Sequence, residues 1–109
     1  MNFEVRATKY FLQQAKKLSK RHASLKQDLA VLIDELAENP LQGTALGKDC
    51  FKIRLAISSK GKGKSGGARV ITNVKIIGKK VFLMDIYDKT DLDNISDKKL
   101  ENLINNLPE

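Results

Sequence analysis

The sequence consists of 109 residues, of which 41% are hydrophobic and 30% are charged, and its formal net charge is +7. This length allows one domain, because two separate cores would each bury too little apolar surface to offset the chain entropy, and the composition excludes a chain that is disordered throughout. No apolar run approaches the roughly 18 residues needed to cross a bilayer, and the N-terminal residues lack the order of a signal peptide, so a cytoplasmic protein is expected.

The sequence offers little for metal or thiol chemistry. Cys50 is the one cysteine, so no internal disulfide can form, and His22, the one histidine, lies far from it along the chain. Because a metal site needs several such ligands at a defined spacing, we expect no metal and no cofactor. Cys50 is predicted to be partly buried and structural, and His22 to be a surface or structural residue.

The first half of the chain predicts a strand followed by two helices. Residues 3–6 alternate apolar and polar side chains, as a short strand does. Thr8 is placed to cap a first helix, and Ser24 with Gln27 has the spacing of a capping box at the start of a second. The second helix ends before Pro40, because proline disfavours a helical conformation in the residue that precedes it. The two helices are expected to form an antiparallel hairpin.

The second half of the chain predicts a meander of three strands. A loop over residues 41–49 leads into it, a link of Ser, Lys and Gly over residues 58–67 joins its first two strands, and Gly78-Lys79 has the character of a hairpin turn. The three strands are predicted over residues 51–57, about 68–77 and 80–87.

A C-terminal helix completes the predicted fold. Ser96 can cap it with Asp97 in the first turn, and Ile95 and Leu100 stand at the positions of a hydrophobic staple. The element order β-α-α-β-β-β-α describes a small single α+β domain over residues 1–109. We expect the helical hairpin and the C-terminal helix to cover one face of a largely antiparallel sheet and to leave the other face for function.

Basic residues gather on that predicted free face. From Lys52 to Arg69 the chain has six basic residues and no acidic one. Lys52 and Arg54 share a sheet face because they are two residues apart, Arg69 lies on the next strand, and Lys89 follows the last strand close to Tyr87. Clustered cations repel one another, so an anionic ligand is expected, and nucleic-acid phosphate is the commonest candidate. The alternative is a solvated face whose cations only keep the protein soluble.

Such a face could cleave RNA without a metal. The reaction needs a base for the 2′-OH proton, cations for the charge on the phosphorane, and an acid for the leaving 5′-oxygen. Crowding by other cations favours the neutral form of a lysine, which can then act as a base, while arginine stays charged. The chemistry is therefore feasible without histidine.

The Lys-Gly link over residues 58–67 could contact the RNA backbone. It is not a P-loop, because the order Gly-x-x-x-x-Gly-Lys-Ser/Thr is absent. Its glycines allow a close approach to phosphates, and Lys60, Lys62 and Lys64 would add attraction that does not depend on sequence and weakens with salt. The alternative is a flexible, solvated hairpin tip.

Three segments together resemble the RelE/ParE toxin superfamily, in particular its HigB-like members. They are Lys52-Ile53-Arg54-Leu55-Ala56, the Lys-Gly link that ends in Gly66-Gly67-Ala68-Arg69, and Ile86-Tyr87-Asp88-Lys89. The element order is also that of the superfamily, so the resemblance covers nearly the whole chain. It implies a toxin that cuts mRNA in the decoding site of the ribosome and is neutralised by a cognate antitoxin protein encoded beside it.

The resemblance also implies roles for individual residues. Lys52 and Arg54 match the paired basic positions used for proton transfer or phosphate binding, and Arg69 matches an arginine that contacts the scissile phosphate. Lys89 falls near a basic residue that stabilises charge. Because arginine is a poor proton acceptor, Lys52 is the better candidate for the base.

One position departs from the RelE pattern. RelE has a late tyrosine that is important for cleavage, and this chain has Asn94-Ile95 near the matching place, with Ile95 explained as part of the helix staple. Tyr87 is the residue that could take over that role, as in HigB-like members. The surroundings of the C-terminal helix are where an antitoxin docks in many members of the family.

Two other functions stay open at this stage. A ParE-like toxin that inhibits DNA gyrase could use the same fold, although chains of that type generally lack the basic cluster. An RNA-binding module without catalysis would bind RNA with a steep salt dependence and leave it intact.

Overall fold

All the predicted helices and strands are present, and one further strand precedes the meander. The structure is a computed structural model that describes residues 2–61, 63–92 and 94–108. None of the described helices is both long and apolar enough to cross a membrane. The elements in chain order are β1 (Glu4–Ala7), α1 (Lys9–Arg21), α2 (Leu25–Glu38), β2 (Thr44–Gly47), β3 (Cys50–Leu55), the short 3₁₀ helices η1 (Ser58–Lys60) and η2 (Lys64–Gly66), β4 (Ala68–Lys75), β5 (Lys80–Asp88) and α3 (Asp97–Asn105).

The strands form one mixed sheet. Across the described parts of the chain its order is β1-β5-β4-β3-β2. The pairs from β2 to β5 are antiparallel, whereas β1 pairs parallel with β5, with Glu4 opposite Lys80. The turn at Gly78-Lys79 joins β4 to β5 as predicted, and both of its residues have positive φ. The largely antiparallel α+β fold is therefore confirmed.

β2 is the strand that the sequence did not predict, because residues 41–49 read as a loop. It forms a tight hairpin with β3, in which Gly47 lies opposite Cys50. Lys48 and Asp49 turn the chain with φ angles of 55° and 61°. Asn-Gly or Asp-Gly normally marks such a turn, so Lys-Asp gives no signal for it in the sequence.

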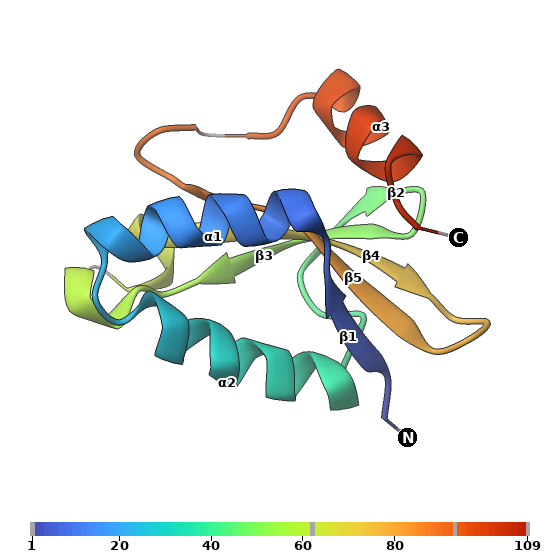
Figure 1. The fold of residues 1–109 in the computed structure, drawn as a ribbon, viewed down its shortest axis with the longest axis horizontal. Helices are drawn as coiled ribbons and strands as arrows, with labels where there is room; N and C mark the ends of the chain where they lie inside the picture. The colour runs from blue at the N-terminus through green and yellow to red at the C-terminus, as the bar shows by residue number, and fades with distance from the viewer. Residues whose placement is uncertain (1, 62, 93, 109) are drawn as a thin grey trace.

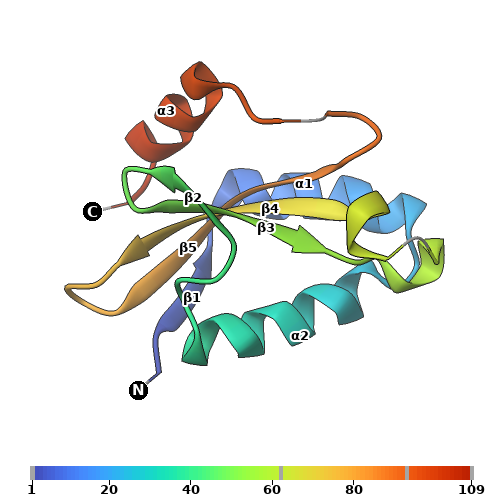
Figure 2. The ribbon, with the colours of Figure 1, turned by 180° about the vertical axis from the view of Figure 1, so that it is seen from behind.

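Helices cover both faces of the sheet, and the prediction of one covered face is wrong. α1 and α2 run antiparallel to each other and pack on one face, in a core that includes Phe11, Leu36 and Val70. α3 packs on the opposite face, where Leu100 lies in a second core with Met84 (Figures 1 and 2). β4 and β5 are buried along almost their whole length. Both faces of these strands therefore carry buried side chains, which the helices shield from water.

Two of the three predicted helix caps are confirmed. Thr8 Oγ1 accepts a hydrogen bond from Phe11 N at 3.1 Å, and Ser96 Oγ accepts one from Lys99 N at 3.1 Å. Ser24 is the exception, because its side chain makes no cap bond. Its hydroxyl instead donates to the Asp28 carboxylate at 2.8 Å, which becomes important for the Lys-Gly link.

Candidate functional site

The strand register brings four of the five predicted catalytic residues onto one face. Arg54 on β3 lies opposite Arg69 on β4, and Arg69 lies opposite Tyr87 on β5. Side chains of directly opposed residues project from the same face of a sheet. Lys52 is two residues before Arg54 on the same strand and so projects from that face one row away. The three meander strands therefore build one continuous row of functional groups.

Lys89 extends this group beyond the end of β5. Its backbone N–H donates to the carbonyl oxygen of Gly67 at 3.1 Å, so the ladder between the two chain segments continues for one more residue. Lys89 lies two residues after Tyr87, at the start of the turn that follows β5. We call Lys52, Arg54, Arg69, Tyr87 and Lys89 together the basic face.

The members of the basic face differ in their accessibility. Arg54 is exposed, and Lys52 is half-buried with its Nζ donating to Asn94 Oδ1 at 2.8 Å. Arg69 is only 3% exposed, and its Nη1 donates to the carbonyl oxygens of Lys64 and Ala68 at 2.9 and 3.0 Å. Arg69 therefore helps to hold the Lys-Gly link in place as well as contributing charge.

Asp85 is the residue of this face that sequence reasoning missed. It lies opposite Ile71, which in turn lies opposite Lys52. The carboxyl of Asp85 is therefore in the row next to the one that contains Arg54, Arg69 and Tyr87. Asp85 is 4% exposed. Burial raises the pKa of its carboxyl, and the charge of Lys99 and the Ile86 N–H offset this only in part. An acid inside an otherwise apolar strand was the available signal.

The Lys-Gly link is folded against the domain. Lys60 has an internal partner, because its Nζ lies 3.0 Å from Asp88 Oδ1 and its side chain is 12% exposed. Lys64 is exposed, and its backbone carbonyl accepts from Arg69. Lys62 lies outside the described residues. RNA binding by these lysines stays a prediction, and the structure gives Lys60 a structural contact instead of a solvated position.

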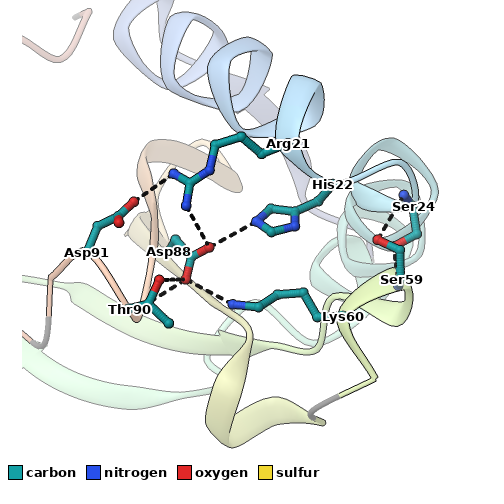
Figure 3. Close-up of polar contacts among 8 residues, drawn as sticks. All are labelled: Arg21, His22, Ser24, Ser59, Lys60, Asp88, Thr90 and Asp91. Carbon is teal, nitrogen blue, oxygen red and sulfur yellow. Dashed lines mark hydrogen bonds and ion pairs between the residues drawn. The ribbon is translucent and has the colours of Figure 1, made fainter.

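Asp88 is the centre of a buried polar cluster that anchors the link (Figure 3). Its side chain is 1% exposed and contacts Lys60, His22 at 2.9 Å and Arg21 at 3.6 Å. Thr90 donates to it from its backbone N–H at 2.9 Å and from its hydroxyl at 2.8 Å. Burial alone would raise the pKa of Asp88, but the hydrogen bonds from Thr90, Lys60 and His22 outweigh burial and hold the pKa well below its usual range. The cluster joins the end of α1, η1 and the end of β5.

A second set of contacts fixes the beginning of the link to α2. The Asp28 carboxylate accepts from the Ser58 hydroxyl at 2.6 Å and from the Ser58 N–H at 2.9 Å. Ser59 N–H donates to Ser24 Oγ at 2.8 Å, a contact drawn in Figure 3. Burial acts to raise the pKa of Asp28, but hydrogen bonds from Ser58 and Ser24 lower it overall. This use of Ser24 explains why it does not cap the helix.

Gly67 ends the link at a point with no room for a side chain. A Cβ atom at this position would overlap the carbonyl oxygen of Leu55. We therefore expect Gly67→Ala to force the link away from β3 and to break the bond between Lys89 N–H and Gly67 O. The measurement is amide hydrogen exchange at Lys89, whose protection should fall at least tenfold.

Gly61→Ala is the control for this prediction. Gly61 has a φ of +69° and open space around its Cα, so an alanine there costs only about 1 kcal/mol of left-handed strain and should leave the exchange of the Lys89 amide unchanged. Equal protection of Lys89 in the wild type and in Gly67→Ala would contradict the proposed close packing.

Comparisons with known proteins agree with this fold. The family model described as the RelE toxin of the RelE/RelB toxin-antitoxin system matches residues 5–106. A free RelE toxin from E. coli that carries two arginine-to-alanine substitutions superposes with a TM-score of 0.66 at 18% identity, covering 99% of this chain and 100% of that chain. The RelBE2 toxin-antitoxin complex from Mycobacterium tuberculosis gives a TM-score of 0.57 at 15% identity, over 81% of this chain and 92% of that one.

The family match and the structural matches carry different weight. No curated protein sequence matches the chain, and at these identities the solved structures show a shared fold only. The family match is the stronger finding, because it extends from β1 to the end of α3. The chain therefore belongs to the RelE toxin family of toxin-antitoxin systems.

Proposed function

We propose that this toxin cuts mRNA on the ribosome and so inhibits translation. The observation that carries the proposal is the row Arg54, Arg69 and Tyr87 across three adjacent strands, with Lys52 one row away on the same face. Membership of the RelE family supports the same reading. A ParE-like toxin inhibits DNA gyrase by binding it, and that function does not require the catalytic groups of the basic face.

The basic face contains the groups that metal-free RNA cleavage needs. Lys52 is the proposed base, and the amide oxygen of Asn94 at 2.8 Å fixes its Nζ without adding a charge. Arg54 and Lys89 are proposed to stabilise the charge that develops on the phosphorane, because stabilisation of this kind is often the largest contribution to catalysis. Arg69 adds charge to the phosphate site and holds the backbone beside it.

Tyr87 is proposed to supply the phenol that RelE carries later in its chain. It lies directly opposite Arg69 and is 8% exposed, so the strand holds its ring firmly. The segment that follows β5 contacts this face at Lys52, whose Nζ donates to Asn94 Oδ1 at 2.8 Å. We propose that message presented by the ribosome is the substrate, and membership of the RelE family supports this.

An acidic antitoxin protein is the proposed partner that controls the toxin. The net charge of +7 favours an acidic partner through fast, electrostatically steered association. Similar toxins occur with antitoxins in the E. coli RelBE complex, at 20% identity and a TM-score of 0.60, and in the mycobacterial complex.

The test is to map new mRNA 5′ ends after brief induction in growing bacteria. The wild type should produce ends at in-frame codon positions, and the double variant Arg54→Ala, Lys89→Ala should not. These two residues are chosen because no hydrogen bond of their side chains holds the backbone in the described structure, whereas Arg69→Ala would also remove two bonds to carbonyl oxygens. Lys17→Ala, an exposed cation on α1, is the matched control and should cut normally.

Each other outcome has a definite meaning. New ends that persist in the double variant would show that the basic face is not the active site. Growth arrest by the wild type without new ends would overturn RNA cleavage, and DNA gyrase would become the next target to assay.

A further inference from the structure

A pocket of about 310 Å³ lies where α1, β5 and the segment leading into α3 meet. Its lining includes Tyr10 from α1, Asp85 and Tyr87 from β5, Asn94 from the connecting segment and Lys99 from α3. Ligand pockets usually measure about 300–1,000 Å³. This one is at the lower limit, and its volume suits a single planar ring system with two tyrosines in its wall.

Two residues of this pocket also belong to the basic face or contact it. Tyr87 is a member of the face, opposite Arg69. Asn94 accepts the hydrogen bond from Lys52 Nζ at 2.8 Å. A nucleotide whose phosphate lies on the basic face therefore has this pocket beside it for its base.

Asp85 has hydrogen-bonding capacity that the residues described by the structure leave unused. Its Oδ1 accepts from the Ile86 N–H at 2.8 Å, and no cation within the described ranges 2–61, 63–92 and 94–108 lies within ion-pairing distance of it. The nearby Lys99 donates from its Nζ to the hydroxyl of Tyr10 at 2.6 Å and lies 4.4 Å from the centre of the Tyr10 ring. A carboxylate can accept about four hydrogen bonds, so the Asp85 side chain, whose residue is 4% exposed, can accept further hydrogen bonds from a ligand in the pocket.

We propose that this pocket receives the base next to the cleaved phosphate and that Asp85 selects a base with an exocyclic amino group. Adenine, cytosine and guanine each present an exocyclic amino N–H that the carboxylate can accept, whereas uracil has no amino group and presents its single ring N–H between two carbonyl oxygens that the carboxylate repels. The rings of Tyr10 and Tyr87 offer apolar surface for the base itself. The inference rests on the proposed function and adds a specificity-determining residue to it.

The first test compares base preference in mapped mRNA ends from the wild type and from Asp85→Asn. The wild type should avoid uracil at one position flanking the cut by about 5-fold or more, the discrimination that one good contact to a base edge supplies. Asparagine offers a donor as well as an acceptor, so Asp85→Asn should admit uracil there while cuts beside amino-bearing bases stay within about threefold. Asp34→Asn, on the exposed surface of α2, should keep the wild-type preference.

The second test leaves the protein unchanged, so it does not depend on the folding of a variant. Messages with adenosine or purine riboside at the selected position differ only in the amino group, and wild-type toxin with ribosomes should cut the purine riboside message at least 5-fold more slowly. Equal rates on the two messages, or a wild-type preference that survives in folded Asp85→Asn, would overturn the role of Asp85 while leaving the proposed function intact. Absence of cutting on every message would overturn both.

Discussion

Lys52→Arg is expected to lower the rate of ribosome-dependent mRNA cleavage by about 100-fold or more, although it keeps the positive charge. General base catalysis contributes roughly 10²- to 10⁴-fold, and arginine cannot accept a proton at neutral pH. The Asn94 amide oxygen that accepts from Lys52 Nζ can also accept from a guanidinium, so the side chain should stay on the same face. The measurement is the single-turnover rate on programmed ribosomes.

Comparison with Lys52→Ala separates a base from a phosphate ligand. If Lys52 is the base, the alanine and arginine variants should cleave at similarly low rates. Lys17→Arg, which changes an exposed lysine on α1, should cleave at the wild-type rate. If Lys52→Arg keeps more than about a third of the wild-type rate while Lys52→Ala does not, the residue contributes charge only, and another group must take the proton.

The second large effect is expected at Asp88, where alanine should reduce the free energy of unfolding by about 3 kcal/mol. Removal of one partner from a buried ion pair leaves the other charge without compensation, and here Lys60, with a side chain that is 12% exposed, would be left beside His22. Urea unfolding at pH 7 measures the loss. The double variant Asp88→Ala, Lys60→Met should recover part of it, because no buried ammonium remains.

Asp91→Ala is the matched control for Asp88. Asp91 pairs with the same Arg21 at 2.8 Å, but its side chain is 54% exposed, and surface pairs of this kind contribute about 0–1 kcal/mol. A loss at Asp91 as large as that at Asp88 would show that burial does not decide the strength of these contacts.

The contribution of Asp88 should also depend on pH in a defined direction. The folded protein holds the pKa of Asp88 below its ordinary value of 3.8, so the stabilisation is fully present above pH 3.8 and is lost as the pH falls through the lower folded value. The difference in stability between the wild type and Asp88→Asn should therefore shrink as the pH falls below about 4. A difference that grows as the pH falls through this range would contradict this assignment.

The basic face could be predicted from the sequence because its members obey local rules. Alternation along β3 places Lys52 and Arg54 on one side, and the short turn at Gly78-Lys79 sets β5 beside β4. Tyr87 lies opposite Arg69 because the ladder shifts between Ile71 and Thr72, and that shift has no signal in the sequence. These rules fix which face a residue occupies. They do not fix its burial, and Arg69 is consequently far less accessible than its place on a cationic face suggests.

The remaining features depend on contacts between distant segments. The pair of Lys60 with Asp88 and the position of α3 on the second face have no counterpart in local periodicity. Asp85 was hidden by an irregularity in the ladder, because Ile71 pairs with Asp85 whereas Thr72 pairs with Leu83. The residue left between them shifts the alternation of β5.

The parallel pairing of β1 with β5 sets an order in which the toxin can be completed during its synthesis. Glu4 and Ala7 of β1 pair with Lys80 and Leu83 of β5. The pairing between β1 and β5 therefore cannot form until most of the chain has left the ribosome that makes it. Sheet pairings between distant segments are also slow to form, because a long loop must close before the contact is made. A newly made chain therefore passes through a stage in which β1 has been made but has no strand to pair with, and an antitoxin made at the same time can meet the toxin before its sheet is complete.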